Sequence, residues 1–506
     1  MRWRNYVVGA AAIAILAWSA IALAQNLVER EARAMLDGWV RTPPAPFTTF
    51  NYGAVRFDFA ERRLVITDIE LTGASDVERI AIETVVVVDP QPFALDNVIN
   101  PARYRGGRGQ GDFAQVASRI EVRAIEVTAS DGEATIATVA TGAVALRQFA
   151  EAPTAQDLGG DIGKVVGIIM PGIRADEITI NSLAWRQDSG GTSIARVSVR
   201  GVDAGRVAQV RIEDLRLVDK EEDVESDAVT IGAFTVTGID LSRALPDMAA
   251  GRPMSATDPE RKPQFDRWEL RTLGGPALAV HGVSLERMGA EVSRPADRAT
   301  ERVDFYAEGI SLAAPTDPES PMARILSGLG YPALTGTIAC VSNSDNIRKR
   351  WTMEPCALSF PGAGTLSLTY VISGLDVSAP ANADGAQALM ESLAAASLDW
   401  IRLGFKDDGL TDRAIAHGSQ SAGQPDEAFR RALVAQIRDG AEAYGGGSPR
   451  VRRVVDAVSA FIDRPGALTV ALEPNKPVAF GSLDFGLLAD PAAAADRLGL
   501  TGTHAR

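Results

Sequence analysis

One apolar pattern recurs along the chain and restricts the folds that it can adopt. Two apolar residues in alternate positions are followed, after a step of three, by two more in alternate positions. The copies are Leu64/Ile66/Ile69/Leu71, Ile120/Val122/Ile125/Val127, Ile178/Ile180/Leu183/Trp185, Val210/Ile212/Leu215/Leu217, Val229/Ile231/Phe234/Val236, Leu278/Val280/Val283/Leu285 and Tyr370/Ile372/Leu375/Val377. Because side chains alternate between the two faces of a β-strand, each copy predicts a strand.

The odd step inside the pattern has a structural consequence. In a regular strand it places the two apolar pairs on opposite faces, so either both faces are buried or a bulge or bend returns both pairs to one face. A sheet whose strands all bend at one level is curved and has a concave side. We therefore expect an extended curved antiparallel β-sheet over residues 47–380, whose concave apolar groove is lined by Ile180, Val210, Ile212 and Ile231. Hairpins of ordinary β-sandwiches are the alternative.

The last part of the chain, residues 381–506, has a different character. Val451, Val454, Val455, Val458, Phe461 and Ile462 form a stripe with helical spacing, which Pro465-Gly466 closes. Strands are predicted after it, at 467–472 and 478–488. We expect an α+β region in which the stripe is core, with a docking face as the alternative.

The N-terminus predicts that the body of the protein lies outside the cytoplasm. Arg2 and Arg4 precede an uncharged stretch from Tyr6 to Ala24, which is long enough to cross a bilayer as a helix. We expect a signal anchor or transmembrane helix over residues 1–25, then an amphipathic helix and Pro-rich spacer over residues 26–46. A signal peptide cleaved after Ala24 is the alternative, and either reading exports the body.

Two cysteines are consistent with a location outside the cytoplasm. Cys340 and Cys356 lie in apolar alternating segments on either side of a polar, turn-rich connection. In an oxidising compartment this arrangement predicts a disulfide across a long hairpin. Two independent buried thiols are the alternative.

The net charge and the sequence motifs limit the classes of function that we expect. The formal net charge of −14 disfavours nucleic acid as a partner, because phosphates need a basic surface. Three histidines lie far apart in the sequence, and no motif supplies a catalytic triad, a metal site or a cofactor loop. We expect no catalytic residues, no metal, no cofactor and no enzymatic activity.

The order of the parts resembles the AsmA-like family of bacterial envelope proteins. The resemblance is carried by the basic-flanked N-terminal stretch, by Val55-Arg-Phe-Asp-Phe59 leading into Leu64–Leu71, and by the strand copies up to about residue 312. It implies a single-pass bacterial inner-membrane protein with its body in the periplasm. It also implies an apolar groove used in envelope lipid binding, transport or maintenance.

Membrane lipids and envelope proteins are the partners expected on this basis. The alternative function is a non-enzymatic envelope scaffold or assembly factor that binds proteins through sheet edges and the C-terminal helices.

Overall fold

The chain forms two compact units in a computed structural model, Met1–Trp268 and Glu269–Arg506. The structure describes residues 28–43, 47–58, 60–73, 77–91, 112–147, 162–187, 189–219, 228–252, 263–295, 300–315, 320–375, 390–444, 448–482 and 490–506. The boundary between the units falls inside a strand. The domain boundary expected near residue 380 lies within the second unit.

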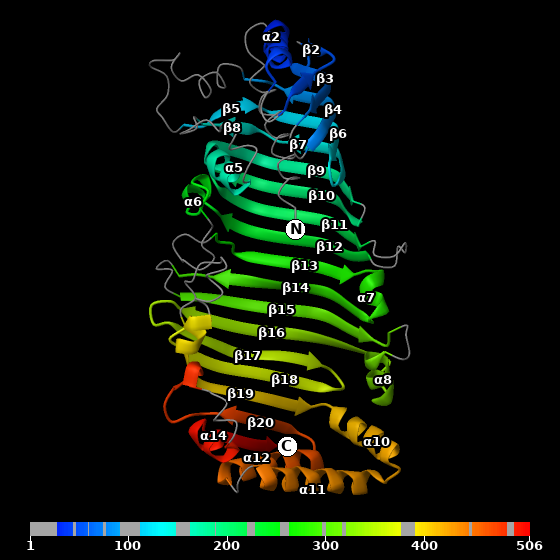
Figure 1. The fold of residues 1–506 in the computed structure, drawn as a ribbon, viewed down its shortest axis with the longest axis vertical. Coiled ribbons are helices and arrows are strands. Elements are labelled where there is room, and N and C mark those ends of the chain that lie inside the picture. Colours follow the sequence, from blue (N-terminus) through cyan, green and yellow to red (C-terminus); the bar gives the residue numbers. More distant parts are fainter. Residues whose placement is uncertain are drawn as a thin grey trace. The chain divides into compact units, whose positions relative to one another are not determined.

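Unit 1 is mostly antiparallel sheet. Its elements are α2 (Val28–Arg41), β1 (Thr49–Asn51), β2 (Val55–Asp58), β3 (Arg63–Thr72), β4 (Val77–Val88), β5 (Ala114–Ala117), β6 (Arg119–Ala129), β7 (Gly132–Thr141), β8 (Val144–Leu146), α5 (Ile162–Ile169), η2 (Met170–Gly172), β9 (Ile173–Gln187), β10 (Gly190–Asp203), β11 (Arg206–Asp219), β12 (Ala228–Asp240) and α6 (Leu245–Ala249). The ladder runs β3–β4–β6–β7–β9–β10–β11–β12, as the stacked arrows of Figure 1 show. The short strands β1 and β2 both pair with β3.

The strands of unit 1 bend at the odd step of the sequence pattern. The register pairs Thr67 with Thr84 and Ile69 with Ile82, and between these pairs Asp68 of β3 and Glu83 of β4 are skipped together. Asp68 has φ 57°, in the left-handed region, and the same conformation recurs at this level of alternate strands of the ladder, at Ala124 (φ 49°), Ser182 (φ 52°) and Asp214 (φ 52°). The bend therefore returns both apolar pairs to one face.

The two faces of this sheet differ in chemistry. In β3 the pattern residues Leu64, Ile66, Ile69 and Leu71 are all buried, whereas the residues between them are partly or fully exposed. The opposite face carries ion pairs between neighbouring side chains, such as Arg79–Glu70 (2.6 Å), Arg200–Glu177 (3.0 Å) and Arg211–Glu213 (2.7 Å). One face is therefore apolar and the other is charged.

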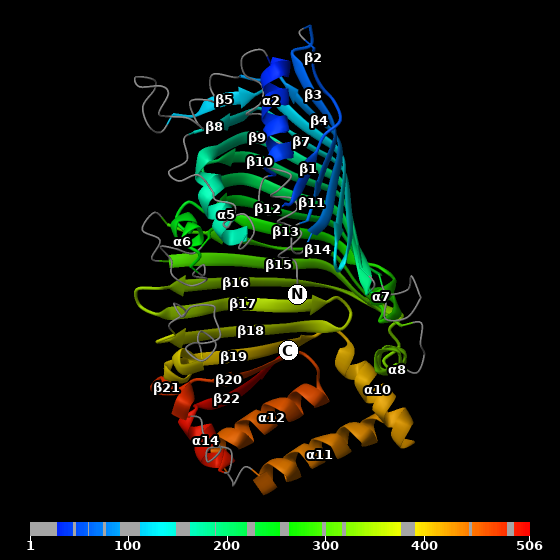
Figure 2. The same ribbon diagram turned by 45° about the horizontal axis from the view of Figure 1, so that its top comes forward.

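Helix α2 covers one end of the apolar face. Ala32 and Leu36 are buried in the same cluster as the pattern residues of β3, β4 and β6. Trp39 packs edge-on against Phe50 at 5.3 Å between ring centroids, and the Tyr52 hydroxyl donates a hydrogen bond of 2.6 Å to Asp37. Figure 2 shows α2 in front of the bent strands.

Unit 2 continues with long strands and then helices. Its elements are β13 (Arg267–Gly274), α7 (Pro276–Val280), β14 (Val283–Ser293), β15 (Thr300–Ala313), α8 (Pro321–Gly328), β16 (Ala333–Asp345), β17 (Arg350–Phe360), β18 (Gly364–Ser373), β19 (Ser397–Asp407), α10 (Leu410–Ala422), α11 (Asp426–Tyr444), α12 (Pro449–Asp463), β20 (Ala467–Leu472), β21 (Val478–Ala479), η4 (Phe480–Ser482), α14 (Pro491–Arg497) and β22 (Leu500–Ala505). The ladder β14–β15–β16–β17–β18–β19–β20–β22 is antiparallel throughout.

The cysteines lie opposite each other on β16 and β17, next to the pair Ala339–Ala357 and beside a shift in register. The Cys340 and Cys356 sulfurs are 1.95 Å apart, at disulfide distance, as the sequence predicts. Because the two strands are hydrogen-bonded neighbours here, the crosslink reinforces the hairpin where its ladder is interrupted.

Helix α12 packs on the end of the unit 2 sheet. The Phe461 ring lies 5.8 Å from the Phe405 ring and 6.2 Å from the His504 ring. Gly502 of β22 permits this approach, because a Cβ there would meet the Cα of Val454 at 2.7 Å. Phe461 and Ile462 of the predicted helical stripe are buried.

The expected membrane helix requires a correction. Residues 1–25 lie outside the described residues, and within the described ones no helix is long and apolar enough to cross a membrane. Helix α11, at 19 residues, carries acidic side chains in its first turn, and α2 has only 14 residues, whereas a span needs about 20 mostly apolar ones. The fold class is thus mainly antiparallel β with C-terminal helices, and a single-pass inner-membrane protein with a periplasmic body is not supported.

The bend can be tested at Ala124, because Asp or Ser occupies the other left-handed positions and alanine gains no side-chain hydrogen bond there. Replacing Ala124 by Val should lower the free energy of unfolding by about 1–3 kcal/mol, because a β-branched side chain is strongly disfavoured at positive φ. Glycine should stabilise by about 0.5–1 kcal/mol. The control is Ala137→Val at the same level of β7, where φ is not positive, and its effect should be small. Urea unfolding measures all three, and equal effects at the two sites would refute the bend's role.

The contact between Tyr52 and Asp37 predicts a pH effect. Burial, then the hydrogen bond to Asp37 and its charge, raise the pKa of Tyr52 from 10.0 to about 12. Since the folded pKa lies above the unfolded one, the stabilisation is complete below pH 10 and is lost as the pH rises from 10 to 12. Burial also raises the pKa of Tyr331 and Tyr370 in unit 2, so the wild type must be compared with Tyr52→Phe. The variant should show a weaker loss of unfolding midpoint above about pH 10; parallel curves would contradict the assignment.

The disulfide predicts a loss of stability on removal. Converting both cysteines to alanine should lower the free energy of unfolding by roughly 3 kcal/mol, because the crosslink closes a loop of about 15 residues. Chemical reduction of the wild type is the control for lost packing, because it breaks the crosslink and keeps both side chains. Non-reducing peptide mapping should find Cys340 and Cys356 linked, and free thiols in freshly purified protein would count against the crosslink.

Candidate functional site

The structure places the four predicted groove residues on one face of unit 1. Ile180 of β9 and Ile212 of β11 both pair with Val197 of β10, so they lie in one row across the strands. Val210 is two residues from Ile212 on the same face, and Ile231 of β12 pairs with Leu215 beyond the bend. All four therefore belong to a single apolar surface, defined here as the β9–β12 face.

The apolar rows are continuous across the whole ladder of unit 1. The row through Ile180 begins at Ile66 and runs through Val85, Val122, Val139, Ile180, Val197, Ile212 and Phe234. The row beyond the bend consists of Ile69, Ile82, Ile125, Ile136, Leu183, Ile194, Leu215 and Ile231. Each row is built only from aliphatic or aromatic side chains, so the face offers almost no hydrogen-bonding groups.

Burial along these rows is uneven. Ile66, Val85 and Val122, at the α2 end, are at most 1% exposed. Ile180, Ile212 and Phe234 are partly exposed, and Leu217 of β11 is 39% exposed. The difference follows from what covers the sheet, because the α2 residues Ala32 and Leu36 pack at the closed end. The same kind of surface is thus filled core at one end and partly open at the other.

A pocket lies at one end of the β9–β12 face. It has a volume of about 320 Å³ and is lined by Trp185, Gln187, Ser189, Gly190, Gly191, Thr192, Leu217, Val218 and Val229. Its apolar wall comes from Trp185, Leu217 and Val229, and its polar rim belongs to the β9–β10 hairpin. Sequence reasoning did not select these three apolar residues, although each belongs to a copy of the recurrent pattern.

Unit 2 has a comparable apolar face. Phe305 pairs with Cys340, Cys356 with Leu368, and Leu368 with Leu403, so the disulfide lies within an apolar row. Leu366 and Leu403 remain 42% and 47% exposed. The predicted disulfide residues and the predicted groove residues belong to different units.

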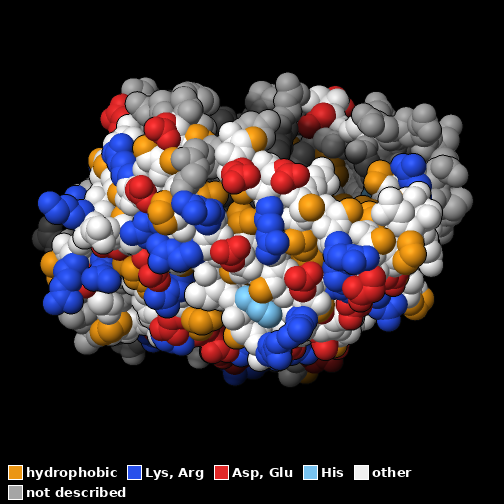
Figure 3. All heavy atoms as spheres, turned by 90° about the horizontal axis from the view of Figure 1, so that it is seen from below, with side chains coloured by type: hydrophobic (Ala, Val, Ile, Leu, Met, Phe, Trp, Pro, Cys, Tyr) orange, Lys and Arg blue, Asp and Glu red, His pale blue; other side chains and the backbone are white. Residues whose placement is uncertain are grey.

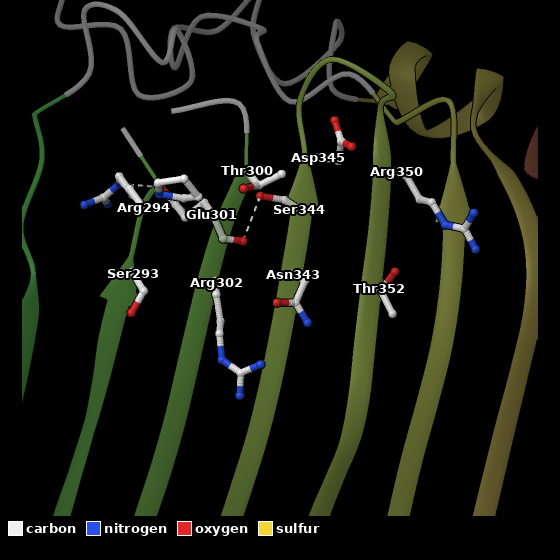
Figure 4. Close-up of a pocket in the computed structure, with 11 residues that line it drawn as sticks. Ser293, Arg294, Thr300, Glu301, Arg302, Asn343, Ser344, Asp345, Arg350 and Thr352 are labelled. Carbon is white, nitrogen blue, oxygen red and sulfur yellow. Dashed lines mark hydrogen bonds and ion pairs between the residues drawn. The ribbon is translucent and has the colours of Figure 1, made fainter. Parts of the chain in front are cut away.

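A polar pocket in unit 2 lacks the geometry of a charged binding site. It measures about 530 Å³ and is lined by Ser293, Arg294, Pro295, Thr300, Glu301, Arg302, Asn343, Ser344, Asp345, Arg350 and Thr352. Figure 4 shows the guanidinium groups of Arg294 and Arg350 pointing to opposite sides, away from the middle. Arg302 is held by Asp304 at 2.8 Å, and Arg294 by Glu301 at 2.8 Å. The cations therefore diverge.

Catalytic and metal-binding groups are dispersed in the part of the chain that the structure describes. There, no three His, Cys, Asp or Glu side chains are placed to hold a metal ion. His281 caps α7, His417 lies beside Gly328, and His504 packs on Phe461. The expectation that the protein has no enzymatic activity stays a prediction.

A comparison with protein families finds a match in unit 2. A family model described as "Uncharacterized protein" matches residues 357–505, which lie within unit 2. No curated protein matches the chain. The match includes α12 and the strands on which it packs, and it excludes the β9–β12 face.

Proposed function

We propose that the β9–β12 face of unit 1 binds the acyl chains of a lipid. The observation that carries this proposal is the change in burial along one set of apolar rows, from closed at α2 to partly open at β12. Apolar surface in water costs roughly 25 cal/mol per Å², so an open apolar face is stabilised by an apolar occupant. The resemblance to AsmA-like proteins points in the same direction.

The chemistry of the face favours an acyl chain over a strand of another protein. A polypeptide brings backbone N–H and C=O groups that need partners when they are buried, and the rows provide almost none. An acyl chain needs only van der Waals contact with side chains such as Ile180, Ile212 and Phe234. Four neighbouring strands at about 4.8 Å spacing give a strip roughly 14 Å across, wide enough for more than one chain.

The scaffold alternative has less support. Phe461 and Ile462 of the α12 stripe are buried, and Phe461 packs on the sheet, so this part of the stripe is not a free docking face. Figure 3 views the side of unit 2 on which α10, α11 and α12 lie, and its Lys, Arg, Asp and Glu side chains are interspersed with scattered hydrophobic ones. A protein-binding patch typically has a contiguous apolar centre, which this view does not show.

The proposal predicts lipid in gently purified protein. Native mass spectrometry should detect a bound phospholipid or fatty acid, and Ile212→Asp should remove it because a carboxylate on the face repels an acyl chain. The fold should survive, since Ile212 is partly exposed. The matched control is Gln209→Asp, which places the same carboxylate on the opposite face of β11.

Two further measurements keep the test decisive. If circular dichroism shows that Ile212→Asp is unfolded, Leu217→Asn replaces it, because Leu217 is 39% exposed. A fluorescent fatty acid should bind the wild type and Gln209→Asp equally, and the face variant at least tenfold more weakly. Absence of lipid in the wild type, together with equal fatty-acid affinity in all variants, would reject the proposal.

A further inference from the structure

The tip of the β16–β17 hairpin combines an exposed aliphatic side chain with a run of cations. Ile347 is 78% exposed, the highest value among the large hydrophobic side chains of the described residues. Arg348, Lys349 and Arg350 follow it directly, and the Arg348 side chain is 82% exposed. Figure 2 shows this hairpin turn at the left, where the strands β16 and β17 end.

The turn is held in a defined conformation. The Asp345 carboxylate accepts hydrogen bonds from the backbone N–H groups of Ile347 (3.1 Å) and Arg348 (2.9 Å). Lys349 has φ 48°, and its carbonyl accepts a hydrogen bond of 2.7 Å from the N–H of Gly374. The backbone of the tip is therefore already ordered, so little backbone entropy is lost when the tip binds.

The charge of the tip contrasts with that of the whole chain. Three consecutive cations stand out against a formal net charge of −14. Elsewhere in unit 2, Glu301 pairs with Arg294, and Glu354 contacts both Arg302 and Asn343. Asp345 supports the turn and lies 3.6 Å from Arg348. The tip is a local basic point on an acidic protein.

We infer that this hairpin tip contacts an anionic lipid surface. Ile347 enters the interface between head groups and acyl chains, while Arg348 and Arg350 bind lipid phosphates. Each Lys or Arg near an anionic membrane contributes favourably, and the effect fades within a Debye length of about 8–10 Å. The acidic remainder of the protein is repelled by an anionic membrane, so only a projecting basic tip can gain from this attraction.

Other partners fit the tip less well. A stable protein interface needs about 800 Å² per partner, and one isoleucine with three cations is far smaller. Single-stranded nucleic acid is held by aromatic stacking, and residues 346–350 contain no aromatic side chain. A fluid lipid surface requires neither shape complementarity nor a large area. The tip is separate from the β9–β12 face, and this inference does not depend on lipid binding there.

Vesicle flotation of the full chain tests the inference. The wild type should float with vesicles of phosphatidylcholine mixed with phosphatidylserine and not with phosphatidylcholine alone. Arg348→Glu should weaken binding on the order of tenfold, and charge reversal at both Arg348 and Arg350 on the order of a hundredfold. Ile347→Asn should also weaken it. The matched control is Lys406→Glu, an exposed lysine of β19 in the same unit, which should leave binding unchanged.

The outcomes separate this inference from the proposed function. Ile212→Asp should still bind anionic vesicles, and Arg348→Glu should still retain any lipid on the β9–β12 face. Equal flotation of the wild type and Arg348→Glu, or equal binding to neutral and anionic vesicles, would overturn the inference. Binding of an acidic peptide or DNA that Arg348→Glu abolishes, without vesicle binding, would replace the lipid surface by that partner.

Discussion

A left-handed residue inside a β-strand costs roughly 1–2 kcal/mol, and unit 1 places one at the same level in alternate strands. The reason lies in the odd step between the apolar pairs. Without the bend at Asp68, Ile69 and Leu71 would face the charged side of the sheet while Leu64 and Ile66 faced the core. Burying two large aliphatic side chains contributes about 1.5–3 kcal/mol each, which exceeds the local strain. The two-faced sheet therefore depends on the bend.

The sequence was sufficient for β3, β6, β9, β11 and β12 and for the existence of a bend, because both follow from the spacing of apolar residues. The copy at Leu278 was wrong in its first half, since Leu278 and Val280 lie in helix α7. The sequence did not identify the left-handed residue in β3, β6, β9 and β11, since Asp68, Ser182 and Asp214 have polar side chains and Ala124 does not. The cysteine pair was predictable because both residues stand in alternating segments around one turn. The stripe on α12 was likewise readable from its spacing, although its contact with Phe405 was not.

Exposure could not be read from the sequence in the same way. Ile66 and Ile212 occupy equivalent pattern positions and one row of the sheet, yet Ile66 is buried and Ile212 is partly exposed. The difference depends on α2, which lies more than a hundred residues from Ile212 in the chain. Local pattern specifies which face a side chain occupies, whereas the covering layer is set by tertiary packing. The same limit applies to the fold class, where the predicted membrane helix found no counterpart in the described residues.

In both units, a helix packs against one end of the apolar face. In unit 1, Ala32 and Leu36 of an amphipathic helix fill one end, and in unit 2, Phe461 of α12 does so beside Gly502. In both units other apolar residues of the sheet stay exposed, with Leu217 in one and Leu366 and Leu403 in the other. A helix can cover such rows because it satisfies its own backbone hydrogen bonds. An acyl chain shares that property, since it has no backbone polar groups to bury. An acyl chain is therefore a physically equivalent cover for the strands that α2 does not reach, which is why the open rows favour lipid over a further strand.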